Sequence, residues 1–131
     1  MEYLSVIAAA AAGYVFGAVW YMVLSKPWVA ASGVKTREDG KPENASNPIP
    51  YLVAFGAAIL VAGMMRHVFA LSGIDTFDKG LISGLGIGLF FATPWLLTCY
   101  NFGGRPFRLT LIDGGYATLG SAIIGAVLTL F

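Results

Sequence analysis

Two short stretches of the sequence place a cation, a proline and an aromatic ring side by side, and an acid follows the second of them. Lys26-Pro27-Trp28 comes after the first long apolar stretch, and Arg105-Pro106-Phe107 comes before the last one, close to Asp113. Cations, a carboxylate and aromatic rings can line a pocket for a polar or anionic group. The structural interpretation is favoured: proline ends helices, and an acid near a helix N-terminus is stabilised by the dipole, with arginine in reach.

Arg66 and His67 form the second candidate, because they are the only ionisable pair well inside an apolar stretch. A cation at the centre of a bilayer costs about 2.5 to 3.5 kcal/mol on insertion scales, so such residues are functional candidates by default. The 15 residues from Tyr51 to Met65 rise about 22 Å, which places Arg66 close to the far headgroups. We therefore expect Arg66 to be an interfacial anchor, with a proton or ligand role for His67 as the alternative.

Catalytic motifs are absent from the sequence. It contains no HExxH, paired CxxC, Walker loop or GxSxG, and its single histidine leaves no acid–base triad or histidine-rich metal site. We expect a protein that is not an enzyme and has no catalytic, cofactor-binding or metal-binding residues. The net charge of +1, with no basic block, also predicts no nucleic-acid partner.

Composition indicates the elements that must position these residues. The chain is 57% hydrophobic and only 11% charged, whereas soluble domains carry about 25% charged residues. About 20 apolar residues span a bilayer as a helix. The only early charge is Glu2, so the first apolar stretch is expected to be a retained helix, not a cleaved signal. We predict an all-α integral membrane four-helix bundle, one four-span domain over 1–131, with spans near 3–24, 51–72, 80–100 and 109–131.

Lysine and arginine counts predict the orientation of these spans, because cytoplasmic loops retain them. The first and third connections hold six of them (Lys26, Lys35, Arg37, Lys41, Arg105 and Arg108), and the other side holds two, Lys79 and Arg66. Both termini should then face away from the cytoplasm, and 25–50 should form a long cytoplasmic loop. The candidate pocket on the cytoplasmic face comprises Trp20, Tyr21, Lys26, Trp28, Arg105, Arg108, Asp113 and Tyr116. An aromatic belt at the membrane interface would place the same rings there without a ligand.

Small residues recur every four positions in three spans, as expected where helices approach closely in lipid. The candidate packing stripe consists of Gly13 and Gly17 in the first span and of Gly80, Gly84, Gly88 and Ala92 in the third. The fourth span repeats the pattern with Ala117, Ser121 and Gly125. We favour packing within the bundle over a dimer face. Pro94 removes a backbone bond to residue 90, which predicts a kink near Phe90.

Two motifs resemble those of the bacterial membrane family named domain of unknown function 1761, over nearly the whole chain. The first helix of that family ends in Gly-Ala-x-Trp-Tyr followed by Lys-x-Trp, here Gly17, Ala18, Trp20, Tyr21, Lys26 and Trp28. Its last turn runs through Gly-Arg-Pro into Asn-x-Gly-Tyr, here Gly104, Arg105, Pro106, Asp113, Gly115 and Tyr116. The family usually has asparagine in place of Asp113 and often histidine in place of Ala117. The resemblance implies a four-helix protein of the bacterial inner membrane, with no assigned activity.

Three functions are compatible with this sequence. The first is a non-catalytic accessory or interaction protein that forms a homo-oligomer or docks on a larger membrane complex, supported by the small-residue stripes and short loops. The second is an oligomeric transporter or channel, whose gate would use Pro94 with Arg66, His67 or Asp113. The third and weakest is a lipid-binding protein in which Lys26, Arg105 and Arg108 hold anionic headgroups.

Overall fold

The computed structural model describes residues 2–131, and this part of the chain is helical without strands. An isolated bridge between Thr36 and Pro42 ties the long connection between the first two spans. The elements in chain order are α1 (Glu2–Val23), α2 (Ser25–Ser32), α3 (Ile49–Ser72), α4 (Phe77–Gly86), the π-helix η1 (Ile87–Ala92), α5 (Thr93–Phe102) and α6 (Phe107–Leu128).

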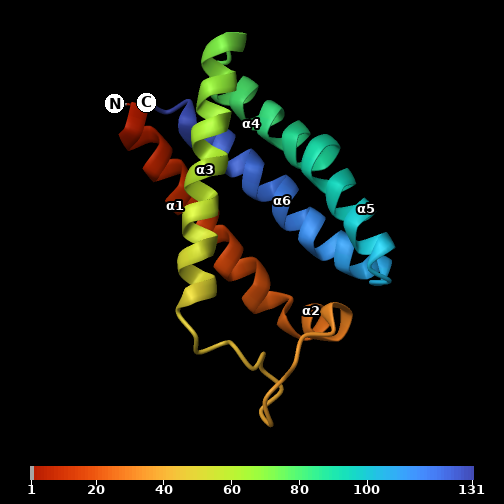
Figure 1. Cartoon of the computed structure of the whole chain (residues 1–131). Coiled ribbons are helices and arrows are strands. Elements are labelled where there is room, and N and C mark those ends of the chain that lie inside the picture. Colours follow the sequence, from red (N-terminus) through yellow and green to blue (C-terminus); the bar gives the residue numbers. More distant parts are fainter. Residues whose placement is uncertain (1) are drawn as a thin grey trace.

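Four helical segments are long and apolar enough to cross a membrane, which confirms the predicted all-α, four-span architecture. The first, second and fourth spans are α1, α3 and α6. The third is the continuous run α4–η1–α5, from Phe77 to Phe102. Figure 1 shows that the chain starts and finishes near each other at one end of the molecule, here called the terminal end. The opposite end, here called the loop end, carries the connections 24–48 and 103–106.

The fourth span, α6, lies at the centre of the arrangement. It packs against α1 on one side and against α4, η1 and α5 on the other, whereas α3 packs mainly against α1 (Figure 1). In the most apolar stretch of α6, 44% of the residues are buried, compared with 17% in the third span. The third span and α3 are therefore the outer helices, each with a broad apolar face left uncovered by the chain itself.

The close approach of α4 to α6 depends on glycine. A Cβ atom added to Gly84 would lie 2.9 Å from the Cα of Ala122, and one added to Gly88 would lie 2.7 Å from the carbonyl carbon of Ala117. Gly80 meets Gly125 in the same way, near the terminal end. The stripes of the third and fourth spans thus face each other inside one chain, where small residues let the two backbones touch.

The core on the α1 side is built from small and flexible residues near the terminal end. Its buried members are Ala9, Ala10, Ala58, Ala62, Met65, Phe69, Ile124 and Leu128. Alanines on α1 and α3 allow those two helices to approach, and the larger side chains fill the space toward α6. Gly13 belongs to the same interface, because a Cβ there would come 2.9 Å from Cγ1 of Ile124.

The first connection differs from the expected loop over 25–50, because it begins with α2. Pro27 was expected to end a helix, but it lies in the first turn of α2, where a backbone N–H has no partner within the helix and its loss costs little. The helix ends instead at Gly33, whose φ of 69° is a left-handed conformation that glycine adopts without strain.

The predicted distortion near Phe90 takes the form of the π-helix η1. Pro94 has no N–H to donate to Phe90, and the N–H of Thr93 reaches back to the carbonyl oxygen of Gly88. The Thr93 hydroxyl donates to the same oxygen over 2.7 Å. The Thr93 side chain thereby gives a hydrogen bond to a backbone carbonyl oxygen in the irregular turn, where lipid could not supply one.

Candidate functional site

Asp113 is the centre of a polar cluster that joins three spans at the loop end. Its carboxylate, on α6, accepts a 2.6 Å hydrogen bond from the Tyr21 hydroxyl of α1. It accepts a second, of 2.5 Å, from the Tyr100 hydroxyl of α5. Hydrogen bonds to an ionised acceptor are stronger than neutral ones, and all three side chains are half-buried. The carboxylate therefore fixes the first and third spans to the fourth.

Trp20 of α1 binds the turn of α6 next to Asp113. Its indole Nε1 donates to the carbonyl oxygen of Ile112 over 2.9 Å. The ring lies flat enough against α6 that a Cβ on Gly115 would meet its Cζ2 atom at 2.6 Å. Gly115 is therefore required for this tryptophan to approach the helix.

Tyr116 of α6 packs its ring against α1. A Cβ on Gly17 would lie 2.6 Å from the Cε1 atom of Tyr116, so this glycine of α1 makes room for the ring. The ring centroid of Tyr116 lies 5.3 Å from that of Tyr21, edge to face, and 6.4 Å from that of Phe16, stacked. Trp28 of α2 meets Tyr21 edge-on at 6.0 Å. The aromatic rings thus form a continuous row from Phe16 to Trp28 beside Asp113, and Tyr21 in that row donates to the carboxylate.

The three cations of the candidate pocket do not converge on Asp113. Lys26, Arg105 and Arg108 are exposed, and within residues 2–131 the one ion pair joins Arg37 to Asp39 in the connection. The expected arginine partner of Asp113 is replaced by two tyrosine hydroxyls. Arg105 instead reaches toward α2, since a Cβ on Gly33 would contact its Nη1 atom. A cation near the C-terminus of a helix is favoured by the helix dipole.

Tyr100 and Thr93 belong to this cluster, although neither is among the eight residues of the predicted candidate pocket. They lie seven positions apart, which is two helical turns, so both can face α6. Besides its bond to Gly88, the Thr93 hydroxyl lies 3.3 Å from the carbonyl oxygen of Gly114 and 3.4 Å from the Thr118 hydroxyl. Polar groups therefore continue from Asp113 toward the middle of the membrane along the α5–α6 interface.

Arg66 and His67 lie on α3 near the terminal end, away from this cluster. His67 is exposed on the outside of α3. Arg66 is half-buried, and its Nη1 atom donates a long 3.4 Å hydrogen bond to the carbonyl oxygen of Leu128. The two neighbours therefore face different surroundings.

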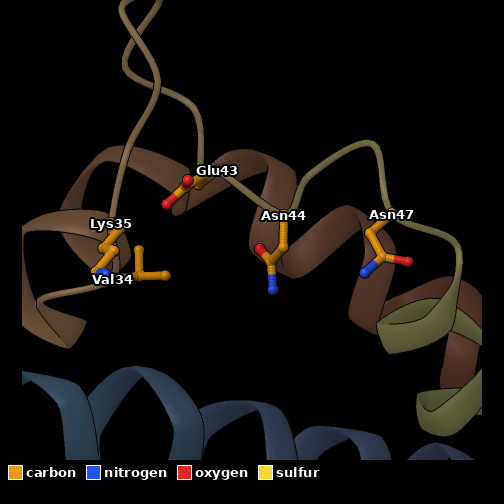
Figure 2. A pocket seen from close by; sticks show the side chains of 5 residues that line it. All are labelled: Val34, Lys35, Glu43, Asn44 and Asn47. Atoms are coloured by element: carbon orange, nitrogen blue, oxygen red, sulfur yellow. The ribbon is translucent and has the colours of Figure 1, made fainter.

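A second polar region lies beneath the long connection. An open hollow of about 430 Å³ is lined by Val34, Lys35, Glu43, Asn44 and Asn47. Figure 2 shows these side chains. A backbone bond of 2.8 Å from the Glu43 N–H to the Lys35 carbonyl closes the connection above it. Among residues 2–131, no three histidine, cysteine, aspartate or glutamate side chains are grouped as metal ligands would be.

A carboxylate that accepts from two phenol hydroxyls has lone pairs left, so the site can accept a hydrogen bond from a further donor. Comparison with protein families finds that the one described as "Protein of unknown function (DUF1761)" matches residues 4–129. Comparisons with curated proteins and with solved structures gave no match.

Proposed function

The chain belongs to the DUF1761 family, a family of unknown function, and from this premise we propose that it is a small, non-catalytic accessory protein of the membrane. It works by associating with a second copy of itself or with a larger membrane protein complex. The site around Asp113 holds the three spans in the geometry that presents the associating surface.

The outer face of the third span is the observation that supports this proposal. The span buries its glycine stripe against α6 and leaves large side chains uncovered: Phe90 is 78% exposed, Phe91 68% and Trp95 65%. Phe90 and Phe91 belong to the π-helix η1, near the middle of the third span. π-helical turns occur often at functional sites, and large aromatic rings are the residues that most often anchor protein interfaces.

The orientation and location are part of the same proposal. Six of the eight lysines and arginines lie at the loop end, five in its connections and Arg108 in the first turn of α6. The positive-inside rule then places the loop end in the cytoplasm and the terminal end outside it. We assign the protein to a bacterial inner membrane on the resemblance stated above. Modifying a cysteine introduced at Glu38 from either side of a sealed membrane would test the orientation, with labelling from the cytoplasmic side expected.

Measuring the mass of the purified protein tests the accessory function. In mild detergent the protein should run as an oligomer or bring a second membrane protein with it. Phe90→Ala and Phe91→Ala together should shift it to a monomer without loss of helix content. A lone monomer from wild-type membranes, at any detergent concentration, would count against the proposal.

An oligomeric, proton-coupled transporter is the second candidate, and the carboxylate of Asp113, hydrogen-bonded to the first and third spans, favours it. Intramembrane acids mark proton relays in many transporters. Proton flux into liposomes, compared between wild type and Asp113→Asn, separates the two functions. A proton flux that this substitution abolishes would support transport. A proton flux that survives replacement of Asp113, Arg66 and His67 would exclude this mechanism.

A further inference from the structure

A hollow of about 310 Å³ lies at the terminal end, far from the Asp113 cluster. Its walls are the last turns of α3, the turn that follows them and the end of α6. The apolar part of the lining includes Phe69, Ile74 and Phe131, and the charged part consists of Arg66 and Asp75. This level is where a span gives way to the headgroup region of a bilayer.

The Arg66 guanidinium has donors that the protein does not use. Its Nε is buried and has no hydrogen-bond partner within residues 2–131. The bond from Nη1 to Leu128 is 3.4 Å long, beyond the usual range of N–H···O bonds. Arg66 forms no ion pair with any carboxylate of the described chain. A half-buried cation in this state is costly, and the planar guanidinium is suited to a phosphate group.

Asp75 contributes the opposite charge to the same lining. It is exposed, lies in the turn between α3 and α4, and has no ion-pair partner in the part of the chain that the structure describes. A purely anionic ligand would therefore meet one attractive and one repulsive group. A ligand with a phosphate and an ammonium group would satisfy both.

The size and the apolar lining point to a membrane lipid. The volume is at the lower limit of small-molecule sites, which begin near 300 Å³, so it suits a headgroup rather than a large ligand. At the rim of the hollow the Phe131 side chain is 54% exposed, so the acyl chains of a bound lipid can lie against it. A ligand that enters from the bilayer can thus keep its tails in lipid.

We propose that this hollow binds the headgroup of a phospholipid carrying both a phosphate and a primary ammonium, with Arg66 on the phosphate and Asp75 on the ammonium. This site is distinct from the surface through which the protein is proposed to associate. It lies on α3 and the end of α6, not on the outer face of the third span.

Native mass spectrometry of the full chain in mild detergent, titrated with defined lipids, tests the proposal. The probes are palmitoyl-oleoyl phosphatidylethanolamine, the phosphatidylglycerol with the same chains, and inorganic phosphate. Wild type should retain phosphatidylethanolamine better than phosphatidylglycerol. Arg66→Gln should weaken retention of both lipids by about tenfold or more, because hydrogen bonds to a charged group are lost. Asp75→Asn should abolish the preference and leave phosphatidylglycerol bound.

Controls keep the test decisive. Lys79→Gln removes an exposed cation at the same end that does not line the hollow, and its lipid binding should equal that of wild type. Arg66→Lys keeps the positive charge with fewer hydrogen-bond donors, so it should bind lipid at a level between wild type and Arg66→Gln. It replaces Arg66→Gln in the test if that variant does not fold. Equal retention by Arg66→Gln and wild type would overturn the proposal. So would an unchanged preference in Asp75→Asn, or displacement of the lipid by equimolar inorganic phosphate.

Discussion

The hydroxyl of Tyr21, at the loop end of the first span, donates a 2.6 Å hydrogen bond to the carboxylate of Asp113, ninety-two residues later in the fourth. Tyr100 of the third span donates to the other carboxylate oxygen. One acid therefore ties together three of the four spans. Its effect on stability should exceed that of any exposed charge at the same end.

Replacing Asp113 should show this effect directly. Asp113→Ala leaves two tyrosine hydroxyls without an acceptor and should lower the free energy of unfolding by about 1 to 2 kcal/mol, since hydrogen bonds inside membrane proteins average about 0.6 kcal/mol each. Asp113→Asn keeps an acceptor oxygen and should lose less than half of that. Unfolding in mixed detergent and dodecyl sulfate, followed by circular dichroism, measures the difference.

Tyrosine variants supply the control for Asp113. Tyr21→Phe should lose stability in wild type but not in the Asp113→Ala background. Tyr3→Phe, at a tyrosine that is 85% exposed, should have no effect in either. Additive losses for Tyr21→Phe and Asp113→Ala would show that the bond contributes nothing to stability.

Alanine substitutions at the glycines of the third span should have very different effects on stability. Gly84→Ala places a Cβ against the backbone of Ser121 and Ala122, and backbone cannot move aside as a side chain can. We expect a loss of about 1 to 3 kcal/mol in the free energy of unfolding, typical of overpacking. Gly86→Ala, two residues away with no atom within 4 Å of its Cβ, should change stability by less than about 1 kcal/mol, in the stabilising direction. Equal losses at both positions would contradict the observed face of the helix.

The turn in the long connection should depend on pH through Asp39. The Lys41 backbone N–H, with smaller contributions from the charges of Arg37 and Lys41, holds the pKa of Asp39 below its usual value of 3.8. A lowered pKa in the folded state means that the stabilisation is present above pH 3.8 and is lost as the pH falls further. The protection of the Lys41 amide, measured by nuclear magnetic resonance as its exchange rate relative to the intrinsic rate at the same pH, should fall on acidification in wild type. Asp39→Asn should remove this dependence, and an identical fall in the variant would contradict it.

The sequence was sufficient for the four spans, and it identified the small residues through which the third and fourth spans meet without pairing these two spans. Charge-free stretches of about 20 residues are nearly unambiguous in length, and the glycines at 80, 84 and 88 find their partners in the matching small residues of α6. The helix α2 was missed because Pro27 was taken as a stop, although proline is tolerated in a first turn.

The partners of Asp113 were beyond reach of the sequence. Which side chains meet across three helices depends on how each helix is rotated about its axis, and almost uniformly apolar spans carry little periodicity to fix that rotation. The opposite charges in the sequence predicted a nearby arginine as the partner of Asp113, whereas the structure places Arg105 beside Gly33. Beside Asp113, Gly17 makes room for the Tyr116 ring and Gly115 for the Trp20 ring, so α1 and α6 can approach closely there.

Photo-crosslinking in intact membranes tests the proposed association most directly. A benzophenone amino acid at Phe90 is compared with one at Leu60, a residue of the other outer span that is 76% exposed, against 78% for Phe90. The account predicts that Phe90 captures a second copy or another membrane protein several times more efficiently than Leu60. Capture of lipid alone at both positions, or equal capture of protein at both, would contradict it.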